Sequence, residues 1–131
     1  MKKNIPALLI LIGLVSTAQM CGKKDDVNPE FGQSSCGVKN PAKDLPWLKD
    51  IITKANEDKA TMAHQGNYMG SIYLESLRDE PVFLVKMMMG SGGLAGYFFR
   101  CDGQRVYPTA EEITTVVAGY QNKKVVYANL P

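Results

Sequence analysis

Hydrophobic residues change their spacing several times along the 131-residue chain, and each spacing predicts a different kind of segment. Residues 5–15 form an apolar run behind Lys2 and Lys3, and small and polar residues follow it up to Met20. A positive start, about eleven apolar residues and a small-residue exit are typical of a secretory signal peptide. Because a membrane-spanning helix needs roughly 20 apolar residues, we interpret residues 1–20 as a cleaved leader.

Residues 21–43 show no apolar periodicity. Gly, Asn, Ser and Pro are scattered through this segment, and such a composition cannot bury enough apolar surface to offset the entropy lost on ordering. We therefore expect a flexible tether here, unless Cys36 fixes it to the folded part.

Helical spacing begins after the tether. Apolar residues recur every three or four positions, at Leu48, Ile51, Ile52 and Ala55. This spacing predicts an amphipathic helix of about 12–14 residues with one face on a core. Asp44 is suited to cap its start, Pro46 is tolerated in a first turn, and Trp47 is expected to anchor the core.

Strand-like patterns follow, over residues 68–77, 82–89, 94–101 and 105–107. Turn residues separate them, and Asp102-Gly103 is the strongest hairpin signal. Successive hairpins predict an antiparallel meander of about four strands.

The end of the chain predicts a second, shorter helix. Thr109 and Glu112 have the spacing of a capping box, and Ile113, Val116 and Val117 follow at helical spacing. Residues 125–127 fit either a last strand or an extended tail. We therefore predict one α+β domain over residues 44–131, a small antiparallel sheet with the helices packed on one face.

Charge depends on processing of the leader. The chain has 15 Lys and Arg against 13 Asp and Glu, and loss of Lys2 and Lys3 leaves 13 of each sign. A neutral domain without a basic stripe lacks the electrostatic footprint of nucleic-acid binding. We therefore expect no nucleic-acid partner.

Three cysteines, Cys21, Cys36 and Cys101, are an odd number for an exported protein. If lipid modifies Cys21, Cys36 and Cys101 remain as a pair in an oxidising compartment. A disulfide between them would stabilise the fold by roughly 4 kcal/mol on the chain-entropy model. The alternative is that both remain unpaired, because spacing alone does not show that two sulfurs meet.

Two cleavage sites compete at the end of the leader. Ser16 and Ala18 suit signal peptidase I, which would release a secreted or periplasmic protein. Lipoprotein processing would instead leave Cys21 first, acylated with chains such as palmitate, and several chains together give stable anchoring. Met20 departs from the usual small residue before the cysteine, whereas Lys23-Lys24-Asp25-Asp26 after it resembles lipoproteins of Bacteroidota. We favour lipidation and attachment to the outer membrane, with exposure at the cell surface.

Candidate catalytic or ligand residues are few. Residues 90–95 match a dinucleotide fingerprint, but the aromatic residues behind them favour a strand rather than the required helix. His64 is the single histidine and is expected on the surface, so no serine or cysteine nucleophile has a spare base. The methionines, among them Met87, Met88 and Met89, are better explained as core filler than as copper ligands. Glu111 and Glu112 are helix-capping residues rather than an acid/base pair. We expect no enzyme activity, cofactor or metal.

Two short motifs carry a resemblance. The helix start Pro46-Trp47-Leu48 and the hairpin Tyr97-Phe98-Phe99-Arg100-Cys101-Asp102-Gly103 resemble those of the small Bacteroidota lipoproteins assigned to a domain of unknown function. The resemblance covers residues 46–107 and implies no activity. We predict a lipid-anchored, non-enzymatic envelope protein with a binding or structural role and a protein partner in the envelope. The alternatives are a hydrolase inhibitor acting through the Gly90–Gly93 hairpin tip, and a small enzyme.

Overall fold

The computed structural model describes residues 34–119 and 123–130, so the predicted leader, Cys21 and most of the tether lie outside the described residues. Eight elements follow one another: α1 (Pro41–Asp44), α2 (Pro46–Thr61), β1 (Gly70–Leu77), β2 (Glu80–Met87), β3 (Ala95–Phe99), β4 (Arg105–Val106), α3 (Ala110–Ala118) and β5 (Lys124–Ala128). No helix in this described part is long and apolar enough to cross a membrane.

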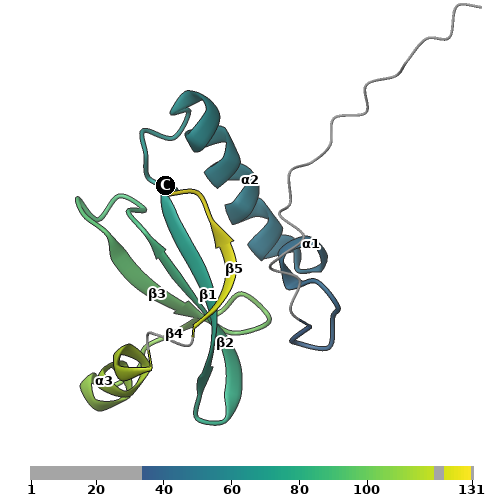
Figure 1. Cartoon of the computed structure of the whole chain (residues 1–131), viewed down its shortest axis with the longest axis vertical. Coiled ribbons are helices and arrows are strands. Elements are labelled where there is room, and N and C mark those ends of the chain that lie inside the picture. The colour runs from purple at the N-terminus through teal and green to yellow at the C-terminus, as the bar shows by residue number, and fades with distance from the viewer. Residues whose placement is uncertain (1–33, 120–122, 131) are drawn as a thin grey trace, which may run out of the picture.

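The strands form one antiparallel sheet in the order β4-β3-β2-β1-β5 (Figure 1). This arrangement confirms the predicted α+β class and the meander from β1 to β4. The sheet has five strands rather than about four, because residues 124–128 return to pair with β1. The hydrophobic pattern of residues 125–127 fits both a strand and an extended tail, and the structure shows a strand.

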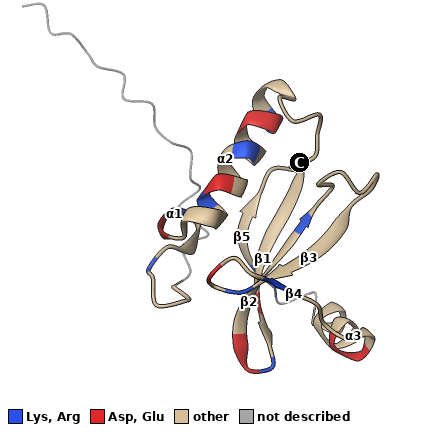
Figure 2. Ribbon diagram, turned by 180° about the vertical axis from the view of Figure 1, so that it is seen from behind, with Lys and Arg blue, Asp and Glu red and all other residues tan. Residues whose placement is uncertain are grey.

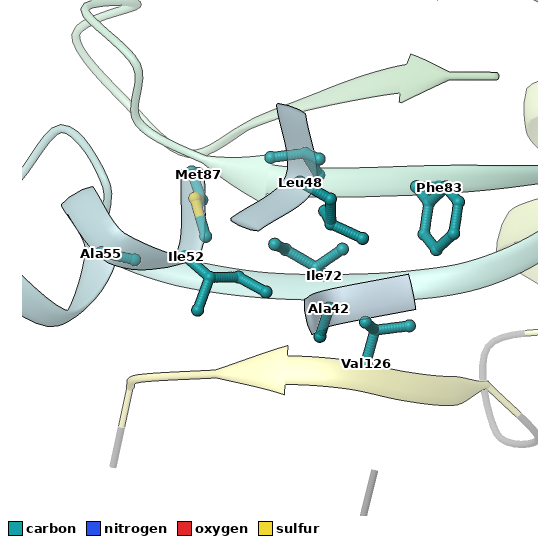
Figure 3. Packing of buried hydrophobic residues seen from close by; sticks show 9 residues of the cluster. Ala42, Leu48, Ile52, Ala55, Ile72, Phe83, Met87 and Val126 are labelled. Carbon is teal, nitrogen blue, oxygen red and sulfur yellow. The ribbon is translucent and has the colours of Figure 1, made fainter. Parts of the chain in front are cut away.

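The main core lies between α2 and the sheet. Side chains from the helix and from three strands point toward one another there (Figure 3). The buried members are Ala42, Leu48, Ile52, Ala55, Ile72, Phe83, Val85, Met87 and Val126. Each large aliphatic or aromatic side chain in such a cluster contributes about 1.5–3 kcal/mol by leaving water. Helix α2 carries charged residues along its length, of which Asp58 is buried, while β3 carries none (Figure 2).

A second apolar cluster lies on the opposite face of the sheet. Val82 and Leu84 alternate with Phe83 and Val85 along β2, so this central strand buries residues on both faces. Val116 of α3 packs in the second cluster. Helix α3 therefore contacts the face opposite to α2 through Val116, which differs from the expectation that both helices pack on one face.

The folded part begins earlier than predicted. Pro41 and Ala42 are buried in α1, inside the segment expected to be a tether ending at residue 43. The disulfide at Cys36 and the favourable position of Pro41 at the helix start give this segment contacts that composition alone does not reveal. Asp44 consequently belongs to α1, where its carboxylate accepts the N–H of Asn40 at 2.9 Å, and does not cap α2.

Helix α2 starts after Leu45 and has 16 residues, longer than the predicted 12–14. It ends where Met62 takes up a left-handed conformation, with its N–H bonded to the carbonyl of Asp58. The capping box of the last helix is confirmed, since Thr109 and Glu112 exchange both of its hydrogen bonds.

Candidate functional site

A disulfide joins the start of the described chain to the β3–β4 turn. Cys36 sits in a tight turn with Gly37, both with positive φ, between the bridged residues Ser35 and Val38. Its sulfur is bonded to that of Cys101, 65 residues away, with the α-carbons 5.5 Å apart. The segment that leads back toward Cys21 is therefore attached beside this turn.

Trp47 packs against the same turn. Its indole N–H donates a hydrogen bond to the carbonyl of Cys101 at 3.0 Å. Its ring lies 5.6 Å from Phe83 and 5.4 Å from Phe99, measured between ring centres. The first turn of α2 and the Cys101–Gly103 turn, which are separate motifs in the sequence, form one contact in the fold.

Beside this contact, three side chains form an exposed surface that we name the Tyr97–Arg105–Tyr107 shelf. Phe99 pairs with Arg105 in the β3–β4 register, so Tyr97 and Tyr107 are the next residues to face each other. The Arg105 guanidinium carbon lies 4.5 Å from the centre of the Tyr97 ring and 5.2 Å from that of Tyr107. Both distances are within cation–π range. Tyr107 is 75% exposed and Tyr97 is half-buried.

Sequence reasoning missed the shelf. Tyr97 was assigned to a strand and Arg105 to a return strand, but no role was given to either. The Asp-Gly signal predicts the turn but not which residues face each other, because two-residue and three-residue loops at this position give different strand registers. A two-residue turn at Asp102-Gly103 would place Arg105 opposite Arg100, whereas the structure closes a three-residue loop, with the Arg100 N–H bonded to the Gln104 carbonyl, and this places Arg105 opposite Phe99.

The remaining candidates do not gather around the shelf. His64 is half-buried, with Nε2 2.7 Å from a Glu57 oxygen and its ring 5.2 Å from that of Tyr68. Met87 is fully buried, as expected of core filler, and Met88 and Met89 are partly buried. Within the described ranges, no three His, Cys, Asp or Glu side chains are grouped to hold a metal ion.

The Gly90–Gly93 segment is an exposed loop between β2 and β3. Ala95 opens a strand, so the helix that a dinucleotide fingerprint requires does not follow. Asn67 holds the base of the loop, where its carbonyl accepts the N–H of Met89 at 2.6 Å and its side chain accepts that of Gly90 at 3.0 Å.

Two carboxylates have clear structural roles. Asp58 was not singled out in the sequence, yet it is fully buried and accepts the N–H groups of His64, Gly66 and Tyr68. Burial alone would raise the pKa of Asp58, but the three N–H donors outweigh it and hold this pKa below its usual range. The carboxylate thus organises the loop that links α2 to β1.

Glu112 binds Arg78 through two N–H···O contacts, at 2.7 and 3.0 Å. The two hydrogen bonds from Arg78 and the one from the N–H of Thr109 lower the pKa of Glu112 to about 2. The ion pair fastens α3 to the β1–β2 turn. Glu111, its neighbour, is exposed, and the two do not form an acid/base pair facing a common cleft.

Comparison of the chain with protein-family models, with curated proteins and with solved structures finds no match. The function is therefore inferred from the residues of this chain. The shelf and the adjacent disulfide are the features that bear on it.

Proposed function

We propose that this chain is a lipid-anchored, non-enzymatic envelope protein with a binding role, attached to the outer membrane through Cys21 and exposed at the cell surface. The leader, the tether and the cysteine content support the anchor, and the exposed shelf supports the binding role. The resemblance to Bacteroidota lipoproteins is consistent with the anchor.

The observation that carries the proposal is the Cys36–Cys101 disulfide. It accounts for two of the three cysteines and suits an oxidising compartment outside the cytoplasm. Cys21 is then the one cysteine left, directly behind the predicted leader, where lipoprotein processing would acylate it. An odd cysteine in an exported protein needs such an explanation.

Substitution Cys21→Ser in the full chain tests the anchor. The wild-type protein should incorporate labelled palmitate and sediment with membranes, and the variant should do neither. A Cys36→Ser/Cys101→Ser variant is the matched control, because it removes two thiols but should keep both properties. Membrane attachment of the Cys21→Ser variant without label would show that the lipid anchor is wrong.

A second candidate is an inhibitor that inserts the Gly90–Gly93 tip into a hydrolase. The favourable observation is that the tip is exposed, with Leu94 51% exposed next to it, while Asn67 fixes its base. A preorganised loop loses little entropy on binding. Titration of secreted proteases and glycosidases with the protein should then give stoichiometric loss of one activity, and Leu94→Asp should abolish it.

A further inference from the structure

We propose that the Tyr97–Arg105–Tyr107 shelf binds a carboxylate-bearing polysaccharide, with Arg105 holding the carboxylate and the two tyrosine rings lying against sugar rings. This inference rests on the proposed binding role and names its ligand class. It requires that the shelf be open, that Arg105 be available to an anion, and that a sugar polymer fit better than other occupants.

The shelf is open because α2 covers only part of its face of the sheet. The strand residues fully buried against α1 and α2 come from β1, β2 and β5, and the described contact of α2 with β3 is that of Trp47 with the partly buried Phe99. In both views α2 lies near the end of the sheet formed by β5 and β1, and β3 and β4 form the opposite end of the same sheet (Figures 1 and 2). The side chains of Tyr97 and Arg105 lie on this uncovered part, as their pairing with Val85 and Phe99 requires.

Arg105 is available to an anion. In the described part of the chain no carboxylate lies within ion-pairing distance of Arg105, and no acceptor takes a hydrogen bond from its guanidinium. Its described neighbours are the two tyrosine rings, which offer π-faces rather than carboxylate or carbonyl acceptors, so the N–H groups of Arg105 can bind a ligand. A carboxylate matches this edge with two parallel hydrogen bonds, and the stacked rings fix the orientation in advance.

Tyrosines suit the rest of a sugar polymer. A pyranose ring presents C–H groups on its faces and hydroxyls on its rim, and a tyrosine ring combines an apolar face with a polar hydroxyl. A polymer of uronic acids would bring one carboxylate with each ring. An exposed shelf also suits a chain lying across it, whereas a small ligand needs a concave site that buries most of its surface.

Other occupants fit less well. A protein partner of ordinary affinity buries about 800 Å² on each side, more than three side chains supply at up to about 250 Å² each. An extended peptide would pair with the β4 edge, but β4 has two residues and Pro108 follows Tyr107 without an N–H to donate. Nucleic acid is disfavoured by the neutral charge of the domain.

Affinity electrophoresis of the full chain, purified in detergent, tests the inference. Polygalacturonate cast into the gel should retard the wild-type protein, and its fully methyl-esterified form should not. Arg105→Gln should weaken binding about tenfold or more, because it removes a charge-assisted bidentate contact. Tyr107→Ala should lose most retardation, while Tyr107→Phe should keep it.

Arg100→Gln is the matched control, since Arg100 is an exposed arginine of the same turn and contacts neither tyrosine. It should bind as the wild type does. Equal weakening by Arg100→Gln, or equal retardation by dextran sulfate, would reduce the effect to general charge and overturn the inference. Absence of wild-type retardation would also overturn it, as would Arg105-dependent binding to phosphatidylglycerol vesicles in place of the polymer.

Unfolding midpoints separate a lost contact from a lost fold. Arg105→Gln and Tyr107→Phe should unfold at the wild-type urea concentration, because both side chains are at the surface. Membrane attachment through Cys21 is measured separately. If the polymer does not bind, the lipid anchor at Cys21 can still be shown by membrane attachment. If Cys21 proves not to be lipidated, polymer binding can still be measured.

Discussion

The indole ring of Trp47 lies directly against the α-carbon of Gly103. A Cβ built on Gly103 would be 2.8 Å from Cγ of Trp47 and 3.0 Å from Cδ1, closer than real side chains approach. Gly103 also has a φ of +84°, which favours glycine. The start of α2 and the β3–β4 turn therefore fit together only because this position has no side chain, and the turn in turn positions Arg105.

Gly103→Ala should destabilise the fold by about 2–4 kcal/mol, the sum of a left-handed backbone and a collision with a partly buried ring. Gly92→Ala is the matched control, because Gly92 has a φ of +74° but nothing within 4 Å of its built Cβ. Gly92→Ala should lower the free energy of unfolding only by the cost of a left-handed backbone, about 1–2 kcal/mol. Urea unfolding of both variants measures the difference. Equal losses would show that the Trp47 contact carries no energy.

The sequence motifs on either side of this contact were visible, but the contact was not. Asp102-Gly103 specifies a turn through local backbone chemistry, and Thr109 with Glu112 specifies a cap, so both could be predicted. Trp47 and the Cys101 carbonyl are 54 residues apart, and local patterns do not say which distant elements meet. The same limit applies to α1, which follows a segment that the disulfide joins to a turn 65 residues away.

Reduction of the Cys36–Cys101 disulfide should lower the free energy of unfolding by roughly 4 kcal/mol, because the unfolded chain regains the freedom of a long loop. The single tryptophan, Trp47, contacts the Cys101 carbonyl, so its fluorescence reports the change locally. Urea unfolding with and without a phosphine reductant measures the effect. Cys36→Ser/Cys101→Ser should match the reduced protein and be insensitive to the reductant.

Stability should fall in acid partly through Asp58. Its pKa in the folded protein is below the ordinary value of 3.8, so the folded state binds fewer protons than the unfolded state in this range. The stabilisation is complete above the unfolded value and is lost as the pH falls through the folded one. Asp58→Asn should be less stable at neutral pH and show a shallower decline below about pH 4.

Asp50→Asn on the same helix is the comparison for that measurement. Asp50 is exposed and pairs only with Lys54, and exposed pairs of this kind contribute little. Its pH profile should follow that of the wild type. If the stability of Asp58→Asn fell with decreasing pH as steeply as that of the wild type, the three N–H contacts would not favour the ionised carboxylate.

Glu112 should add a second acid-sensitive contribution. Arg78 and the N–H of Thr109 lower its pKa from 4.5 to about 2, so its contribution is present above pH 4.5 and is lost as the pH falls toward 2. Glu112→Gln should flatten this part of the stability profile, with the largest effect in α3. Glu111→Gln removes the adjacent exposed charge and should leave the profile unchanged. Circular dichroism melts between pH 2 and pH 6 separate the two variants.

The sheet was easier to predict than the site because strand patterns are local, whereas the site depends on pairing. Alternation and turns gave four strands to within about two residues, and β5 stayed ambiguous because a short apolar segment near a terminus fits a tail equally well. Asp58 looked like one more acidic residue on a helix. Its burial follows from the path of residues 62–68 across the end of α2, which no periodicity encodes.

Asn129 should be the residue that holds the C-terminal strand in place. It is buried, its N–H donates to the carbonyl of Gly70, and its side-chain oxygen accepts the N–H of Gly70 at 2.7 Å. Its amide nitrogen donates to the carbonyls of Ala55 and Tyr68, both at 3.0 Å. Asn129 thus joins α2, the following loop and β1 to the end of β5.

Asn129→Asp should destabilise the domain more than Asn129→Ala, although aspartate is nearly the same size. The new oxygen would face two carbonyl oxygens with no proton between them, and burial would oppose its charge. Alanine only leaves the polar groups unpaired, at about 2–4 kcal/mol. The aspartate variant should recover part of its stability as the pH falls and its carboxyl protonates. Hydrogen exchange should show loss of protection first in β5, and protection equal to the wild type would exclude this role for Asn129.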